Sequence, residues 1–359
     1  MNAHDDDLKV LPVDEASALA AAYYVDPAVA AVEREQVFSR SWQLAARSGD
    51  LTAAGDHVVC EIAGTPLIIV RGADGVLRAL HNVCRHRAGP LATENGRGAK
   101  NLRCRYHGWT YALDGGLRAA PEMSEASDFD VSAIRLTAAR VHEWQGLVFV
   151  ALDDDTPPFE TVYGGITERI APVDLATMTF HSRVEYEVAC NWKVYIDNYL
   201  EGYHLPHVHP GLSKVLDYRS YDTELFEWYS LQHSPLRDAD DIYGGGDAWY
   251  FFVYPNIMLN IMPARLQTNV VLPLALDRCK VVFEYFFSGD GVARSGSDLE
   301  FSDEIQQEDI DICQQVQKGL LSGGYVPGRL SPKREAGVWH FQNLLRGAYS
   351  STGWRRHHI

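Results

Sequence analysis

The segment Asp197–Pro210 reads DNYLEGYHLPHVHP and brings a carboxylate close to three histidines. On a helix, Glu201 and His204 would lie on one face, because residues three apart are neighbours on a helix surface. His207 and His209 follow a proline that hinders helix continuation, so we expect them at a helix end or in the loop beyond. Two imidazoles and a carboxylate with open positions are the ligand set of an oxygen-activating non-haem iron. Because His-rich turns also bind zinc or stay solvated, the rest of the chain must decide the chemistry.

The composition is that of a globular chain with a large core. The chain has 359 residues, of which 46% are hydrophobic and 22% are charged, and this length favours two domains. The net charge of −16 argues against nucleic acid or anionic lipid as a main partner. No apolar run has the length of a membrane span, and the acidic N-terminus does not resemble a signal peptide. We therefore expect a cytoplasmic protein.

The pattern of apolar residues and turn-forming residues changes twice along the chain. Residues 1–44 are expected to form an N-terminal helical segment, residues 45–155 a small antiparallel β domain, and residues 156–359 a second domain. The polar stretch DDDTPP at 153–158 marks the second boundary. Short apolar or alternating runs separated by glycine-rich turns predict the β domain. These runs are Val58–Ile62, Leu67–Val70, Val76–His81 and Leu147–Leu152.

The second domain mixes strand and helix patterns. Alternating or continuous apolar runs predict strands, and longer segments with a helical period predict helices. The predicted strands are Thr179–Val188, Tyr250–Met262, Leu266–Leu276 and Lys280–Phe287, and the predicted helices are Asn191–His204 and Ser302–Leu321. Strands flanked by long helices indicate an α+β domain with an antiparallel sheet.

A second group of metal-ligating residues lies in turn-rich loops of the β domain. The sequence CRH at 84–86 is followed by CRYH at 104–107, and the four candidate ligands are Cys84, His86, Cys104 and His107. Two thiolates and two imidazoles suit either a Cys2His2 zinc ion or a two-iron cluster with both histidines on one iron. Zinc motifs more often pair like residues, whereas each pair here mixes Cys with His, which favours the cluster.

These residues carry a family resemblance. HNVCRHR at 81–87 and CRYHGW at 104–109 closely resemble the Rieske [2Fe-2S] motif of Rieske non-haem iron oxygenases. The Rieske proteins of respiratory chains carry an extra cysteine in each ligand loop, and neither loop has one here. The resemblance extends over nearly the whole chain after the N-terminal helix. It implies an α+β protein with an all-β Rieske domain followed by a helix-grip catalytic domain, in which long helices pack on an antiparallel sheet.

The resemblance also implies a mononuclear iron. The iron motif of the family, an acidic residue, x2, His, x4, His, matches Glu201, His204 and His209, and leaves His207 as the alternative to His209. The third ligand of the family is a carboxylate on a late helix. Asp309 is the only charge on a predicted helical stripe that comprises Ile305, Asp309, Ile312, Val316 and Leu320. A carboxylate aimed into a core is costly unless it is paired, so Asp309 is either an iron ligand or the partner of a buried arginine.

The neighbouring carboxylates have other expected roles. Asp311 shares a polar face with Glu304, Glu308, Gln315 and Lys318, so Asp311 is expected in solvent. In the family, the acidic residue at position 201 bridges a Rieske histidine and an iron histidine, normally between subunits of a homotrimer. Most members have Asp there, and Glu201 resembles the branch of choline, glycine betaine and carnitine oxygenases. Asn198 and Asp197 are weaker candidates that could support the iron ligands or lie exposed.

The resemblance implies an oxygenase that uses O2 and receives electrons singly from its Rieske cluster. Since no dinucleotide fingerprint occurs, a separate flavin or iron–sulfur reductase would supply electrons from NAD(P)H. The arginines of the ligand loops could dock that reductase or stabilise the charge of the cluster. They are Arg85, Arg87, Arg103 and Arg105.

The resemblance around Glu201 implies a small quaternary or methylated ammonium substrate, hydroxylated beside nitrogen with N-demethylation or C–N cleavage. Aromatic residues that could form a cage for it by cation–π attraction are Tyr203, Trp249, Tyr250 and Phe252. Packing in the sheet and core explains most aromatic residues in strands and is the favoured interpretation of these residues. One alternative is an aromatic ring-hydroxylating dioxygenase. A second is a Rieske electron-transfer protein without oxygenase activity.

Overall fold

The computed structural model describes residues 8–236 and 245–351. The chain divides into two compact units, one formed by Phe38–Pro157 and the other by the segments before and after it. The leading segment groups with the second unit because its side chains pack there: Tyr23 stacks on Tyr349, with ring centroids 5.4 Å apart. The expected domain limits at 44/45 and 155/156 remain predictions.

The Phe38–Pro157 unit, called the β unit below, is built on antiparallel strands. Its larger sheet has the order β1-β9-β8-β4-β3-β2 among the described residues, and a small sheet has the order β5-β6-β7. The bounds are β1 Gln43–Arg47, β2 His57–Ile62, β3 Thr65–Arg71, β4 Leu77–His81, β5 Leu102–Arg103, β6 Thr110–Tyr111, β7 Leu117–Ala119, β8 Ala138–Trp144 and β9 Leu147–Ala151. Strands β2, β3, β4 and β9 confirm the four predicted runs.

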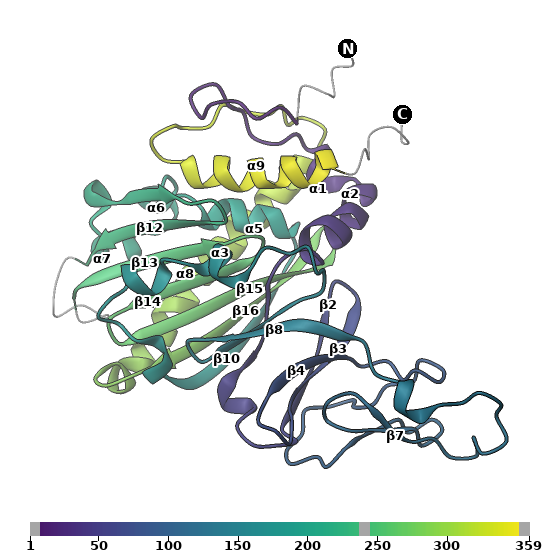
Figure 1. The fold of residues 1–359 in the computed structure, drawn as a ribbon. Helices are drawn as coiled ribbons and strands as arrows, with labels where there is room; N and C mark the ends of the chain where they lie inside the picture. Colours follow the sequence, from purple (N-terminus) through teal and green to yellow (C-terminus); the bar gives the residue numbers. More distant parts are fainter. Residues whose placement is uncertain (1–7, 237–244, 352–359) are drawn as a thin grey trace. The chain divides into compact units, whose positions relative to one another are not determined.

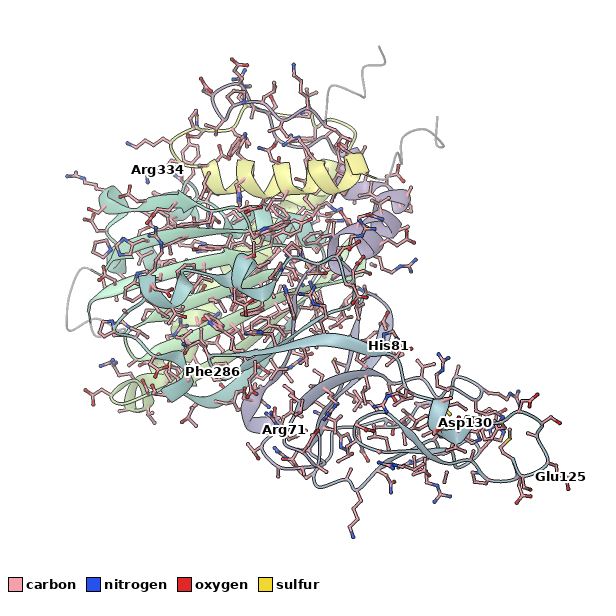
Figure 2. The ribbon with its side chains drawn as sticks, in the orientation of Figure 1. Arg71, His81, Glu125, Asp130, Phe286 and Arg334 are labelled. Carbon is pink, nitrogen blue, oxygen red and sulfur yellow. The ribbon has the colours of Figure 1, made fainter. Side chains whose placement is uncertain are left out.

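Strand β3 separates two apolar cores of the β unit. Successive side chains of a strand point to opposite faces, so Ile68 and Val70 pack in one core and Leu67 and Ile69 in the other. The first core contains the two buried cysteines of the ligand loops. Figure 2 shows the side chains, with Arg71 and His81 at the ends of β3 and β4 and with Glu125 and Asp130 in the loop after β7.

The remaining segments, called the catalytic unit below, contain a seven-stranded antiparallel sheet among the described residues. Its order is β10-β16-β15-β14-β13-β12-β11. The bounds are β10 Thr179–Val188, β11 Asp222–Leu225, β12 Tyr229–Pro235, β13 Asp247–Val253, β14 Ile257–Met262, β15 Arg265–Ala275 and β16 Arg278–Phe287. The single strand predicted over 250–262 is wrong: it is the hairpin β13–β14, which turns at Tyr254–Asn256. The turn was not predicted because it is only three residues long and apolar residues continue on both sides of it, so that the run resembles one strand.

Helices cover the sheet of the catalytic unit. The longer ones are α5 Trp192–Tyr199, α8 Gly291–Leu321 and α9 Ala336–Ser351. The shorter ones are α1 Ala22–Val25, α2 Pro27–Val32, the π-helix η1 Glu33–Phe38, α3 Phe159–Tyr163, α4 Ile166–Arg169, α6 Leu205–Val208 and α7 Leu212–Val215. Helices α5 and α8 contact each other and β16, and α9 contacts β11. Figure 1 shows α9, in yellow, along the end of the sheet where β12 lies.

Two predicted helices differ in extent from the observed ones. Helix α5 ends at Tyr199, and a turn separates it from α6, so the predicted helix over 191–204 is too long. Helix α8 begins at Gly291 instead of Ser302, because its polar first turns carry no apolar period. Helix α9 was not predicted, although its buried residues repeat every three or four positions. They are Val338, Phe341, Leu345 and Tyr349.

The face that α8 buries is polar. Val316 of the predicted apolar stripe is 45% exposed, so that part of the prediction is wrong. The buried residues of this face are instead mainly Ser302, Gln306, Cys313, Gln317 and Leu320. The reason is hydrogen bonding: the hydroxyl of Tyr195 donates to Gln306, and the backbone N–H of Asn191 donates to Gln317. Asp309 lies at the edge of this face and is half-buried.

Within residues 8–236 and 245–351, the structure has no helix with the length and apolar character needed to cross a membrane.

Candidate metal centres

Two loops of the β unit share one backbone design. In the first, the N–H of Ala88 donates to the carbonyl of Cys84, and the N–H of Cys84 donates to the carbonyl of Gly89, both at 2.9 Å. The second loop repeats both bonds at the same length, with Cys104, Gly108 and Trp109 in the corresponding positions. Ala88 and Gly108 both have positive φ, +57° and +76°, which turns each loop tightly around its cysteine. The matched loops therefore present two thiols in equivalent settings.

The four predicted cluster ligands divide by burial. Cys84 and Cys104 are 3% and 2% exposed, whereas His86 and His107 are exposed at the loop tips, with ring centroids 4.6 Å apart. A Cβ on Gly89 would lie 2.9 Å from the sulfur of Cys104, so only glycine leaves room beside that thiol. The sulfurs thus face the protein and the imidazoles face outward.

The spacing of these side chains distinguishes a cluster from a single ion. The ligand atoms of a tetrahedral zinc lie about 2.0–2.3 Å from the metal and therefore close to one another. Within the described part of the chain, the one group of three or more His, Cys, Asp or Glu whose ligand atoms all lie within 4.8 Å of one another is His204, His209 and Asp309. The Cys and His side chains of the β unit are thus spaced too widely for one zinc ion. They fit the larger [2Fe-2S] group, with both sulfurs on one iron and both imidazoles on the other.

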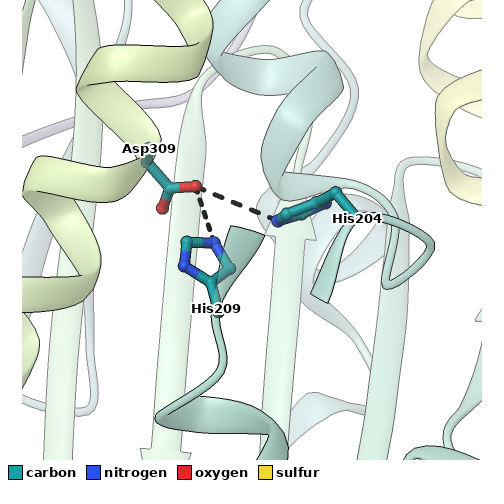
Figure 3. Close-up of side chains that lie close together, drawn as sticks. All are labelled: His204, His209 and Asp309. Atoms are coloured by element: carbon teal, nitrogen blue, oxygen red, sulfur yellow. Dashed lines mark hydrogen bonds and ion pairs between the residues drawn. The ribbon is translucent and has the colours of Figure 1, made fainter. Parts of the chain in front are cut away.

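The second centre is formed by the turn after α5, the end of α6 and the middle of α8. Figure 3 shows His204, His209 and Asp309 converging. Nε2 of His209 lies 3.0 Å from Oδ1 of Asp309, and Nε2 of His204 lies 3.9 Å from the same oxygen. His207 is exposed and is not part of this group, so the geometry favours His209 over it. Among the described residues, the side chain of Asp309 contacts Asn198, His204 and His209 and forms no ion pair with an arginine, which favours the ligand role over the buried ion pair.

The Nδ1 atom of each imidazole in this group, on the side of the ring away from Asp309, contacts a glutamate carboxylate. Nδ1 of His204 lies 2.7 Å from Glu201, and Nδ1 of His209 lies 2.7 Å from Glu308. In metal sites, such a carboxylate fixes the ring orientation and leaves Nε2 for the metal. Asp311 is exposed as expected, whereas Glu308 of the same polar face is half-buried against His209. Its partner is 99 residues away along the chain, and no local pattern pointed to it.

The electrostatics of His209 also fit a cation site. The ring is 1% exposed, and burial lowers its pKa, but the hydrogen bonds and charges of Asp309 and Glu308 outweigh burial and raise the pKa overall. A metal ion would replace a proton at Nε2, so metal binding should weaken as the pH falls. The donor set of two imidazoles and one carboxylate matches that of non-haem iron(II).

The two weaker candidates on α5 have different roles. The side-chain amide of Asn198 donates to Oδ1 of Asp309 at 2.6 Å, so Asn198 supports the carboxylate of the centre. Asp197 is directed elsewhere: it accepts hydrogen bonds from Tyr24 at 2.6 Å and from Gln342 at 3.1 Å. Burial raises the pKa of Asp197 to about 6. Asp197 thus ties α5 to the leading segment and α9, and the idea that it supports the iron ligands is not favoured.

A cavity opens onto this centre. It is lined by aromatic, apolar and amide side chains, among them Tyr195, Tyr199, Tyr221, Gln232, Tyr250, Asn260, Arg265, Gln267, Asn269, Phe283 and Gln306. Of the four predicted pocket residues, only Tyr250 lines it. Trp249 points to the opposite face of β13, and Phe252 lies further along that strand against Phe341 of α9. Tyr203 is 51% exposed and does not line the cavity.

Comparison with known proteins identifies the family. Residues 41–137 match the family model of the Rieske [2Fe-2S] domain, and residues 175–351 match that of the ring hydroxylating alpha subunit catalytic domain. The chain belongs to the Rieske non-haem iron oxygenases. It corresponds to their catalytic alpha subunit, so the fold and the enzyme class expected from the sequence are confirmed.

The similar proteins act on quaternary ammonium compounds. This oxygenase is 36% identical to the chloroplastic choline monooxygenase of Arabidopsis thaliana, over 93% of this chain and 83% of that protein. It is 31% identical to the carnitine monooxygenase oxygenase subunit of Escherichia coli K12, over 92% and 93% of the two chains. A crystal structure of the quaternary ammonium Rieske monooxygenase CntA with its substrate L-carnitine superposes with a TM-score of 0.83 at 26% identity. That match covers 95% of this chain and 99% of the other.

Proposed function

We propose that this oxygenase hydroxylates a carbon beside the nitrogen of a small quaternary or methylated ammonium compound. The observation that carries the proposal is the cavity, which places aromatic side chains, among them Tyr199, Tyr221 and Tyr250, beside the candidate iron ligands. Aromatic faces bind an ammonium by cation–π attraction. The similarity to choline and carnitine monooxygenases supports the same substrate class.

The side chains divide the work between two centres. Cys84, His86, Cys104 and His107 would hold the [2Fe-2S] cluster, and His204, His209 and Asp309 the iron. When bound, the cluster supplies single electrons and the iron activates O2, so that hydroxylation consumes one O2, two electrons and two protons and releases one water. The chain itself orients the imidazoles through Glu201 and Glu308 and keeps the ammonium group beside the iron ligands.

Glu201 would also connect the centres. Its carboxylate already contacts Nδ1 of His204 at 2.7 Å, and the family pattern places a Rieske histidine of a neighbouring subunit on its other side. A CntA structure is described in terms of inter-subunit electron transfer, which supports this arrangement for a relative. The proposal therefore includes a homotrimer. It also includes a separate NAD(P)H-dependent reductase and a cytoplasmic location, as expected from the sequence.

The alternatives are less well supported. An arene would bury the unpartnered Nε2 donor of Gln306 at the cavity wall without giving it a hydrogen-bond acceptor. A Rieske electron-transfer protein would not need the assembled group of His204, His209 and Asp309.

A substrate screen tests the proposal. The holoenzyme with a suitable reductase is expected to consume O2 and release formaldehyde or an aldehyde with at least one of choline, carnitine and glycine betaine, in proportion to NAD(P)H oxidised. Toluene and naphthalene serve as matched probes for ring hydroxylation. Coupled turnover with an arene and with no ammonium compound would contradict the proposal.

Replacement of Glu308 by glutamine is expected to weaken binding of the mononuclear iron about 10–100-fold, because the ring of His209 loses its charged partner. Iron retention against a chelator measures the effect, and the visible spectrum of the cluster serves as the internal control. The exposed Glu304 of the same helix provides a matched variant, Glu304→Gln, that should retain iron normally. Equal iron retention in both variants would mean that Glu308 does not support His209.

A further inference from the structure

Gln306 of α8 has a buried donor at the wall of the cavity. The residue is 2% exposed and lines the cavity together with Tyr195 and Asp309. Its Oε1 accepts a hydrogen bond from the hydroxyl of Tyr195 at 2.6 Å. Its Nε2 is buried and has no hydrogen-bond partner among the described residues. Buried amide donors are normally satisfied, so an orphan donor at a cavity wall points to a ligand.

The hydrogen bond from Tyr195 determines the orientation of the Gln306 amide, and therefore which of its two ends has no partner. Burial, and then the charge of Asp309, raise the pKa of Tyr195 well above its usual value, so the phenol keeps its proton and acts as the donor. If the amide of Gln306 were reversed, the proton of Tyr195 and the oxygen of Gln306 would both lack partners. The observed orientation satisfies both groups and leaves only the N–H of Gln306.

This donor lies close to the iron ligands. Gln306 precedes Asp309 by three residues, about 4.5 Å along the axis of α8. Across the cavity, the alternating residues Arg265, Gln267 and Asn269 of β15 face the same space. Arg265 donates to Oε1 of Gln267, and Nε2 of Gln267 donates to Oδ1 of Asn269 at 2.7 Å. The polar side chains of this strand therefore hydrogen-bond one another, whereas the N–H of Gln306 has no partner among the described residues.

The cavity therefore combines two kinds of surface. Its aromatic faces, among them Tyr199, Tyr221 and Tyr250, suit the cationic nitrogen of a substrate, while the unpartnered N–H of Gln306 suits an oxygen. We propose that Nε2 of Gln306 binds an oxygen on the chain attached to the ammonium group, either an alcohol or a carboxylate, and thereby selects substrates that carry one. Tyr195 is the positioning residue for this contact. The inference rests on the proposed ammonium substrate and adds a recognition element for its second functional group.

The test measures binding of three probes to the anaerobic iron-loaded holoenzyme by calorimetry. Choline carries an alcohol, glycine betaine a carboxylate, and tetramethylammonium no oxygen. Gln306→Met keeps the length of the side chain but removes the donor. It is expected to weaken binding of the preferred oxygen-bearing probe about tenfold. Tetramethylammonium binding and iron content should change little, while the melting temperature should fall because the buried hydroxyl of Tyr195 loses its acceptor.

Tyr195→Phe is the second variant, and it keeps the donor but releases the amide. It should also weaken binding of the oxygen-bearing probe relative to tetramethylammonium, but by a smaller factor than Gln306→Met. A loss confined to choline identifies the alcohol, and a loss confined to glycine betaine identifies the carboxylate. If the affinity for choline or glycine betaine, divided by the affinity for tetramethylammonium, is the same in both variants as in the wild type, that result overturns the role of Gln306 and leaves the proposed ammonium substrate standing. If the wild-type enzyme binds none of the three probes, the ammonium proposal and this inference both fail.

Discussion

Replacement of Asp309 by alanine is expected to remove the mononuclear iron and to lower turnover at least about 10³-fold, or ~4 kcal/mol at 1.36 kcal/mol per factor of ten. Asp309 supplies the single carboxylate of the group, and its Oδ1 faces both Nε2 atoms. Without it, two imidazoles remain, which is too few ligands to retain iron(II). The visible spectrum of the cluster should be unchanged, because its four ligands belong to the β unit.

The structure offers a matched control for this experiment. Asp311 lies two residues further along α8 and is exposed, so Asp311→Ala should keep both metals and normal turnover. The fold of Asp309→Ala should survive, since a half-buried carboxylate is costly to desolvate and its removal leaves mainly Asn198 without its partner. Normal iron content in Asp309→Ala would remove this residue from the ligand set.

Replacement of Glu201 by glutamine is expected to keep iron and cluster at wild-type levels and to reduce coupled turnover at least about 100-fold, or ~2.7 kcal/mol. In the proposed arrangement, Glu201 accepts N–H groups from imidazoles of both centres, and a neutral amide can accept on one side only. Single-turnover kinetics measure the defect directly: the pre-reduced cluster of the variant should reoxidise slowly in the presence of substrate and O2.

Glu308 provides the comparison that separates electron transfer from iron binding. Glu201 and Glu308 each lie 2.7 Å from Nδ1 of an iron-site histidine, so a general loss of ring orientation should affect both variants alike. We expect instead slow cluster reoxidation in Glu201→Gln and weak iron retention in Glu308→Gln. Near-normal coupled turnover of Glu201→Gln would end the bridging role.

The candidate ligands that come in short motifs could be selected from the sequence alone. The loops around Cys84 and Cys104 carry their own hydrogen-bond pattern, and His204 and His209 lie within one turn-rich segment. Their spacing along the chain therefore indicates their chemistry. The four strands of the β unit were predicted correctly for the same reason, since alternation is a local signal.

Long-range partners could not be predicted in this way. Asp309 was selected from an apolar stripe, but the observed stripe includes the exposed Val316, and the face that α8 buries is largely polar. Gln306 and Glu308 acquire their roles from residues 111 and 99 positions away, and polar side chains on a helix usually indicate a solvated face. The aromatic run on β13 gave a partly wrong prediction of the pocket residues for a related reason. Successive side chains of a strand point to opposite faces, so Trp249 and Tyr250 cannot both line the cavity.

One chain is expected to carry both a Rieske cluster and a mononuclear iron. This is tested by the iron and acid-labile sulfide per chain of anaerobically purified protein, together with the EPR spectrum of the reduced state. We expect about three irons and two sulfides per chain with a Rieske-type signal, as the two sets of ligands require. Zinc in place of the cluster iron, with no sulfide, would contradict the claim.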